Sequence, residues 1–320
     1  MRFFRTFLKA ACAVLAAGLS MSAAAAWPER TVTLIAPYPA GGNADAMARL
    51  VAKGLSARIG QPVIVENKPG AGGMLGSQYV ARAKPDGYTF LLGALSNVLN
   101  EFTYKRPLLD LRKDLVPVSQ VASIPNYFAA GLGTRFANLA DLIAEAKAKP
   151  GKLTCATSGV GTSGHLACEM LKQRTGANVL IVPYKGGAPA ITDVLGGHAT
   201  FLAINEVLPY IRDKRLTGLA VTSAQRSPMA PELPPAAETI PGFELVSWYG
   251  VFAPTGTPPE IVAKVSTAIG ELLKSKESIE QLKNLGASPV GTSPKEFSEF
   301  VQVELDRWEK IIKPLNIALD

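Results

Sequence analysis

The chain alternates short β-branched and apolar runs with longer segments of helical periodicity, and this alternation limits the fold more than any other feature. Runs such as Thr31–Ala36 and Tyr88–Leu92 have strand character, and the segment after the first run spaces its apolar residues by three and four. The same order begins again near residue 139. This pattern predicts α/β layers, and 320 residues with 48% hydrophobic and 18% charged residues suffice for two such modules.

The pattern predicts the following elements. Strands are expected at residues 31–36, 62–66, 88–92, 116–121, 127–132, 153–157, 179–183, 200–204, 216–222 and 248–253. Helices are expected at residues 46–55, 75–83, 139–149, 166–171, 188–195, 208–212, 260–274 and 294–313.

This order fits two similar βα modules, one inserted into the other. The first would hold residues 27–125 together with 226–320, and the second residues 126–225. Such an insertion requires at least two crossing strands and creates a hinge with a cleft. Ligands of open α/β sheets bind beyond the carboxyl ends of the strands, so we expect the site in this cleft.

Residues 1–26 have the pattern of a secretory signal peptide. An apolar run from Ala10 to Leu19 is followed by the small residues Ala24–Ala26, which suit cleavage near Ala26. The cationic residues ahead of the run are Arg2, Arg5 and Lys9. The run is shorter than the roughly 20 residues that span a bilayer, which favours export over a retained membrane anchor.

Loss of this segment would remove three bases and no acids. The remainder then has 30 Lys and Arg against 26 Asp and Glu, a net charge of +4. A charge this small gives no reason to expect a nucleic acid or a membrane surface as partner.

The cysteines and histidines are few. After the signal peptide only Cys155 and Cys168 remain, and they form either a disulfide in an oxidising compartment or two buried thiols. The histidines are His165 and His198, and neither cysteine belongs to a C-x-x-C motif. We therefore expect no zinc site or other metal centre.

Two glycine-rich loops, one in each module, connect a strand to a helix. They span residues 37–45 and 158–165. The free N–H groups at the start of such a helix form a ready anion site. For either loop alone, an ordinary capped helix after a tight turn is the alternative. Two such loops facing one cleft favour an anion site.

The second loop also contains a dinucleotide-type motif, because Gly159, Gly161 and Gly164 satisfy G-x-G-x-x-G. A dinucleotide fold places an acid at the end of the next strand, and here that strand ends in residues 181–185 without one. We therefore expect no nucleotide cofactor.

Catalytic groupings are equally sparse. Ser163 and His165 are too close in sequence to face each other as nucleophile and base, and no G-x-S-x-G is present. An exported serine hydrolase using Ser163 would lack a base and an orienting acid. The sequence predicts a protein that is not an enzyme.

Four segments of the chain together resemble a known family. They are Trp27–Asp45 (with APYPAGGNAD at its end), Val65–Gly73 followed by Pro85–Tyr88, Val182–Pro189 (VPYKGGAP) and Leu219–Ser223 (LAVTS). All are similar to the Bug receptors, the TctC-like solute-binding proteins of tripartite tricarboxylate transporters. The resemblance covers nearly all of the chain after the signal peptide, in order.

The resemblance implies a two-lobed α/β fold of the periplasmic-binding-protein type (Venus-flytrap, type II-like) in the periplasm. Such a receptor, expected here as a monomer, captures a small carboxylate and delivers it to the membrane subunits of the transporter. The ligand would be a di- or tricarboxylate or an aromatic carboxylate, and the sequence does not choose among them. A sensor that presents its ligand state to a membrane kinase would share the same fold and pocket, so it stays an alternative.

By position, the resemblance also implies which residues bind the ligand carboxylate. In the first lobe these are Tyr38, Gly41, Gly42, Asn43 and Asp45, with Ser96 and Asn97 after the strand ending at Leu92. In the second lobe these are Gly161, Thr162, Ser163 and His165.

One stretch departs from the family pattern, which usually has acids near positions 200 and 204. This chain has Thr200 and Ile204 there, followed by Asn205. We interpret this as a less charged distal pocket with Asn205 as a neutral donor. A ligand that carries an amine, such as an amino acid, would then lose its partner.

Overall fold

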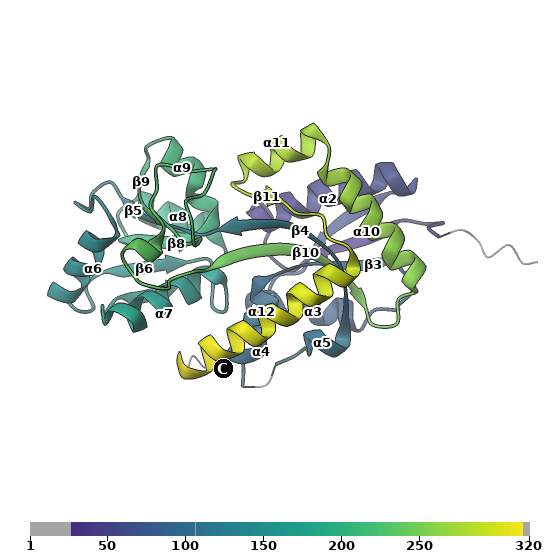
Figure 1. The fold of residues 1–320 in the computed structure, drawn as a ribbon, viewed down its shortest axis with the longest axis horizontal. Coiled ribbons are helices and arrows are strands. Elements are labelled where there is room, and N and C mark those ends of the chain that lie inside the picture. The colour runs from purple at the N-terminus through teal and green to yellow at the C-terminus, as the bar shows by residue number, and fades with distance from the viewer. Residues whose placement is uncertain (1–26, 106, 316–320) are drawn as a thin grey trace, which may run out of the picture.

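The computed structural model describes residues 27–105 and 107–315, which form two mixed β-sheets side by side (Figure 1). The expected signal peptide lies outside the described residues. The two sheets confirm the prediction of an α/β fold.

The first sheet has the strand order β11-β4-β10-β3-β1-β2. Strands β1, β2 and β3 are parallel to one another, whereas β10 is antiparallel to both β3 and β4. The strands are β1 (Val32–Ala36), β2 (Val63–Asn67), β3 (Thr89–Ala94), β4 (Leu115–Pro125), β10 (Val246–Pro254) and β11 (Ser288–Pro289). Its helices are α2 (Asn43–Ile59), α3 (Met74–Ala81), α4 (Leu95–Thr103), α5 (Leu111–Asp114), α10 (Pro259–Leu273), α11 (Lys276–Asn284) and α12 (Pro294–Leu315).

The second sheet has the order β7-β6-β8-β5-β9, with β5 antiparallel to both neighbours. Its strands are β5 (Tyr127–Gly131), β6 (Thr154–Thr157), β7 (Leu180–Pro183), β8 (Phe201–Ile204) and β9 (Leu216–Val221). Its helices are α6 (Leu139–Ala148), α7 (Ser163–Thr175), α8 (Gly187–Leu195) and α9 (Leu208–Arg212). Short 3-10 turns are η1 (Ala71–Gly73), η2 (Asn205–Val207) and η3 (Ala236–Glu238).

The strands β4 and β10 carry the chain between the sheets. They pair along their whole length, from Val246 opposite Pro125 to Pro254 opposite Leu115. Between them and the second sheet, Asn126 and Thr222 exchange hydrogen bonds, with Thr222 N donating to Asn126 O at 2.9 Å and Asn126 N to Thr222 Oγ1 at 2.8 Å. The junction is therefore a pair of strands fixed by buried hydrogen bonds.

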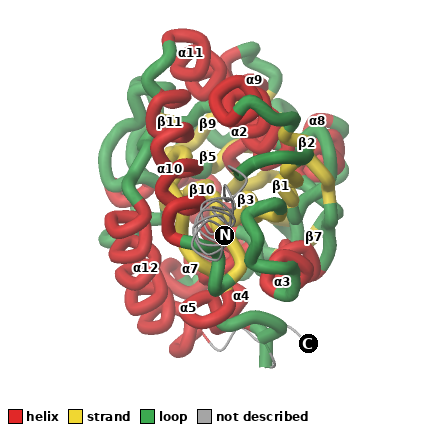
Figure 2. The backbone as a smooth tube through the Cα atoms, turned by 90° about the vertical axis from the view of Figure 1, so that its right-hand side faces the viewer, coloured by secondary structure: helices red, strands yellow, loops and turns green. Residues whose placement is uncertain are grey.

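Helices cover both faces of each sheet, and the strand sequences show it (Figures 1 and 2). In β1, Leu34 packs in one apolar cluster with α2 and α10, while its neighbour Ile35 packs in another with α4 and α12. Both side chains are fully buried. A strand with two covered faces favours apolar residues on both sides, and β1 (VTLIA) is apolar except for Thr33, which is only partly buried.

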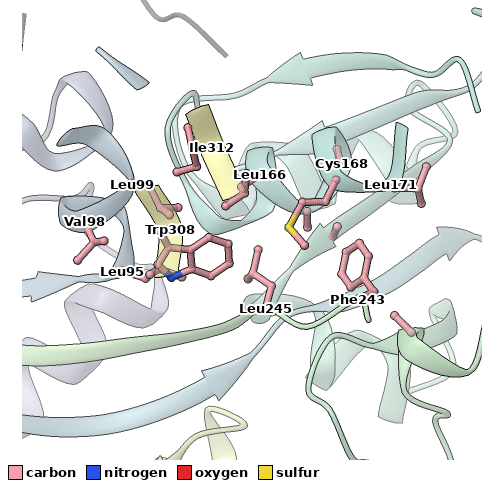
Figure 3. Packing of buried hydrophobic residues seen from close by; sticks show 14 of the residues in the cluster. Leu95, Val98, Leu99, Leu166, Cys168, Leu171, Phe243, Leu245, Trp308 and Ile312 are labelled. Carbon is pink, nitrogen blue, oxygen red and sulfur yellow. The ribbon is translucent and has the colours of Figure 1, made fainter. Parts of the chain in front are cut away.

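One apolar cluster extends from the first sheet to the second. Leu95 and Leu99 of α4, Leu166 of α7 and Trp308 and Ile312 of α12 belong to it (Figure 3). All are buried, and Trp308 also donates its indole N–H to the Glu304 carboxylate at 3.1 Å. The C-terminal helix therefore packs across the boundary between the modules, opposite the strand junction.

The ten predicted strands are present, most of them within two residues of the predicted bounds. The sequence analysis missed α4, α5, α11 and β11. Helix α4 begins directly after β3, with Ala94 as its N-cap, so no turn residue marks the change of structure in LLGALSNVL. Helix α11 contains only two apolar residues, Ile279 and Leu282, which is too few to mark a helix in the sequence.

No helix in the described part of the chain combines the length and apolarity needed to cross a membrane.

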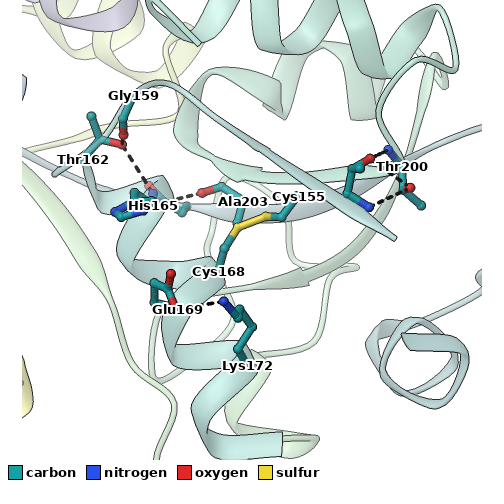
Figure 4. Close-up of a disulfide and its surroundings, with 11 residues drawn as sticks. Cys155, Gly159, Thr162, His165, Cys168, Glu169, Lys172, Thr200 and Ala203 are labelled. Atoms are coloured by element: carbon teal, nitrogen blue, oxygen red, sulfur yellow. Dashed lines mark hydrogen bonds and ion pairs between the residues drawn. A yellow bond between two sulfur atoms is a disulfide. The ribbon is translucent and has the colours of Figure 1, made fainter. Parts of the chain in front are cut away.

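Cys155 and Cys168 form a disulfide that joins β6 to α7 (Figure 4). Both residues are completely buried, and their Cα atoms are 6.5 Å apart. The sequence left open a disulfide or two buried thiols, and the structure has the disulfide. It fixes the middle of α7, the helix that follows the second glycine-rich loop, to β6 of the second sheet.

We expect the double substitution Cys155→Ala/Cys168→Ala to lower the free energy of unfolding by about 3 kcal/mol, because the bridge closes a loop across a sequence separation of 13 residues. Urea unfolding of both proteins, without reductant, measures the difference. Dithiothreitol should destabilise the wild type and leave the double variant unchanged. Detection of two free thiols in the unreduced, denatured wild type would contradict the bridge.

Glu101 in α4 is a second position with a clear consequence. Burial raises the pKa of this carboxyl to about 7. The hydrogen bond that it accepts from Leu111 N lowers the pKa, but by less. The folded protein therefore holds this proton more tightly than the unfolded chain, in which the group titrates near 4.5. The stability from this group is complete below about pH 4.5 and is lost as the pH rises through 7.

Glu101→Gln should consequently be more stable than the wild type at pH 8, by about 1 kcal/mol, and similar to it at low pH; partial solvent contact keeps the effect below the full linkage value. The glutamine retains an acceptor for Leu111. Urea unfolding across this pH range provides the measurement. Parallel stability curves for the two proteins would show that Glu101 titrates normally.

Candidate functional site

A cavity of about 130 Å³ lies between the two sheets. Its wall consists of residues at or after the carboxyl ends of β1, β3, β6, β7 and β8, together with side chains from the start of β10. An apolar cavity of about 150 Å³ is known to hold benzene, so this volume suits a ligand of a few carbon atoms. The position agrees with the cleft expected from the strand order.

The loop from β1 to α2 is held in shape by Asp45. Its carboxylate accepts hydrogen bonds from Gly41 N at 3.1 Å, from Arg49 Nε at 3.0 Å and from Asn67 Nδ2 at 3.0 Å. Burial alone would raise the pKa of Asp45, but the hydrogen bonds that it accepts together hold the pKa below its ordinary value. Gly41 has φ of +90°, which favours glycine.

The start of α2 keeps its N–H groups available. Its N-cap residue, Gly42, lines the cavity and offers no side-chain acceptor. The first N–H groups of a helix have no partner within the helix, and together they attract anions. This loop therefore presents backbone donors to the cavity.

Neutral hydroxyl groups complete the wall of the first module. Tyr38 and Ser96, the second residue of α4, share a short hydrogen bond between their hydroxyls. Burial raises the pKa of Tyr38 to about 12 and that of Tyr249 well above its ordinary value. Both phenols therefore stay protonated at neutral pH and can donate to an anion.

In the second module, Thr162 caps α7. Its hydroxyl accepts from His165 N at 3.4 Å and donates to Gly159 O at 2.7 Å (Figure 4). The next residue, Ser163, lies 3.2 Å from the side-chain nitrogen of Asn126 at the strand junction. The second loop is thus tied both to its own helix and to the hinge.

The two modules touch over the cavity. Asn43 Nδ2 at the start of α2 donates to Asn205 Oδ1 of the second module at 3.1 Å. A side chain on Gly72 would lie 2.9 Å from Val160 O, so the η1 turn packs closely against the second glycine-rich loop. These contacts bring the two sides of the cavity together.

Six of the predicted site residues line the cavity: Tyr38, Gly42, Ser96, Thr162, Ser163 and Asn205. The other six, Gly41, Asn43, Asp45, Asn97, Gly161 and His165, do not line it. Asn97, for example, is occupied elsewhere: its side chain accepts a hydrogen bond from Ala94 N at 2.8 Å and donates one to Ser77 Oγ at 2.6 Å. Such residues shape the loops from behind the wall.

The cavity also contains residues that the sequence analysis did not single out, among them Lys185, Glu206 and Tyr249. Glu206 follows Asn205 directly and lines the cavity, so the wall carries an acid beside the predicted neutral donor; the less charged distal pocket stays a prediction. The family positions 200 and 204 drew attention to Thr200 and Ile204. An acid shifted along the chain to the start of η2 would have been found only by asking which residues follow the end of β8.

The environment of Ser163 and His165 does not suit a serine hydrolase. Ser163 bonds to the Asn126 amide, which is no base, and His165 lines a small, mostly apolar pocket together with Leu99, Leu166 and Ile312. Burial lowers the pKa of His165. Within the described residues, no group of three or more His, Cys, Asp or Glu side chains could hold a metal ion.

We expect Asp45→Asn to destabilise the protein by about 1 kcal/mol at neutral pH, because asparagine retains an acceptor but not the charge that Arg49 pairs with. The lowered pKa of Asp45 means that its contribution is present above the ordinary pKa and is lost as the pH falls through the folded value. The difference between the two proteins should therefore shrink in acid.

Urea unfolding at neutral and acidic pH measures this effect. Asp306→Asn is a suitable control, since that carboxylate is exposed and pairs with Arg112 on the surface. An equal effect from both substitutions would show that the β1–α2 loop does not depend on Asp45.

Comparison with known proteins identifies related chains. Residues 47–317 match the family described as "TctC: Tripartite tricarboxylate transporter family receptor". The chain is 37% identical to the protein BugT of Bordetella pertussis over 298 residues, which are 92% of this chain and 91% of that protein.

Two solved structures are closely similar. The structure of R. palustris Rpa4515 with adipate has a TM-score of 0.87 and 36% identity, and the match covers 91% of this chain and 99% of that one. The periplasmic binding protein BugD has a TM-score of 0.86 and 33% identity, with coverage of 91% and 99%.

Proposed function

Since the chain belongs to the TctC family of tripartite tricarboxylate transporter receptors, we propose that it captures a small carboxylate in the cavity between its two sheets and delivers it to the membrane subunits of such a transporter. It is a periplasmic solute-binding protein and not an enzyme. One observation carries the choice of ligand: a small cavity bounded by two strand-to-helix loops whose helix starts supply donors for an anion. The Rpa4515 structure, which holds adipate, supports the same class.

A carboxylate would be held mainly by neutral donors. The uncapped start of α2, the Tyr38 and Tyr249 phenols and the Thr162 and Ser163 hydroxyls surround the cavity. Such donors stabilise an anion without the desolvation penalty of a buried cation. We assign the ligand-contact role to the residues that line the cavity and a supporting role to Asp45 and Asn97 behind them.

Binding would close two lobes about the strand junction. We assign residues 27–125 and 226–320 to one lobe and residues 126–225 to the other. The membership of the two sheets supports this division, as does the position of Asn126 and Thr222 where both strands cross. A closed form stabilised by its ligand is the form that a transporter can recognise.

The proposed route is export with cleavage near Ala26, followed by work as a monomer in the periplasm. The buried Cys155–Cys168 bridge supports an oxidising compartment. Transport is preferred to a role as sensor for a membrane kinase because the matching family consists of transporter receptors.

The experiment is a thermal-shift screen of small mono-, di- and tricarboxylates, aromatic and amino-substituted acids included. A ligand at a hundredfold excess over its Kd should stabilise the folded protein by about 2.7 kcal/mol and raise the Tm. The methyl ester or primary amide of the same acid is the control and should give no shift. Absence of a shift with every carboxylate at millimolar concentration would refute the proposal.

A further inference from the structure

The cavity wall contains one acid, and its surroundings are unusual. Glu206 follows β8 at the start of η2, and its carboxylate lies between the starts of α2 and α8. A side chain on Gly187 would meet Glu206 Oε1 at 2.8 Å, and one on Gly42 would meet it at 3.6 Å. The two glycines thus leave room for this carboxylate beside the very loop that is expected to bind the ligand.

Glu206 has no cationic partner within the described residues. Burial raises the pKa of its carboxyl, and the only hydrogen bond that opposes this comes from its own backbone N–H. Lys185 is the one basic residue on the cavity wall, and it is exposed and forms no ion pair with Glu206. The starts of α2 and α8 offset part of the cost of holding this partly buried carboxylate, but within the described residues no cation neutralises its charge.

This acid changes which carboxylates the cavity can accept. A plain dicarboxylate in so small a cavity would bring a second negative charge close to Glu206, and like charges at short range repel strongly where water is excluded. An ammonium group at the same place would pair with Glu206 and remove the penalty of its burial. The nearby Tyr249 and Asn205 are neutral and leave this charge balance unchanged.

We propose that the ligand is a zwitterion, a small amino acid whose carboxylate binds the two helix starts and whose ammonium group pairs with Glu206. This inference rests on the proposed function, because it takes a carboxylate ligand in this cavity as given. It assigns to Glu206 the role of specificity residue, which accepts amino-substituted acids and rejects plain dicarboxylates.

The test is isothermal titration calorimetry at pH 7.5 with matched pairs of ligands on the dialysed protein. The pairs are succinate and 3-aminopropanoate, glutarate and 4-aminobutanoate, and propanoate and L-alanine. In at least one pair the ammonium-bearing member should bind the wild type more tightly by about tenfold or more. Glu206→Gln should abolish this preference by weakening the amino acid and strengthening the dicarboxylate.

Glu101→Gln is the matched control, because it removes a partly buried carboxylate outside the cavity and should leave the preference intact. The wild-type comparison alone tests the inference should Glu206→Gln not fold. Tighter binding of the plain acid in every pair, or equal losses for both members in Glu206→Gln, would overturn it while leaving the proposed function standing. Binding of no carboxylate of either kind would overturn both.

Discussion

The antiparallel ladder between β4 and β10 is the interaction on which the rest of the structure depends. It joins the two sheets, and where it ends the buried pair Asn126 and Thr222 carries the hydrogen bonding on into the second sheet. Because these two strands are covalently continuous with both sheets, they set the angle at which the carboxyl ends of the strands face each other. The Asn126 side chain also bonds to Ser163 on the cavity wall, so the same junction that orients the lobes positions one of the donors.

The chemistry of the cavity follows from the choice of neutral donors over cations. A buried arginine would bind any carboxylate strongly but would carry a large desolvation penalty whenever the lobes close without ligand. Helix starts and protonated phenols avoid that penalty, because their dipoles are already oriented by the backbone and by contacts such as Asp45 with Gly41. Selectivity among carboxylate ligands then depends on the charged residues of the wall, of which Glu206 is the acid.

Much of this arrangement could be predicted from the sequence. The strands are recognisable as short runs rich in β-branched and apolar residues, as in TVTLIA, and the glycine-rich loops mark the turns that follow β1 and β6. Helix α4 could not, because it begins without a turn residue after β3. Glu206 was missed for a different reason: its place directly after β8 makes it a candidate, but whether its side chain enters the cavity depends on how η2 turns, which the local sequence does not show.

The closed contacts explain why a shifted acid matters. Asn43 of one module bonds to Asn205 of the other, and the adjacent Glu206 reaches across to the same helix start at Gly42. The residue that bonds across the two sheets and the residue that carries the charge are therefore neighbours in one turn. A ligand that neutralises Glu206 acts on the segment that bridges the modules, so its recognition and the stability of the closed form are linked through a single short stretch of chain.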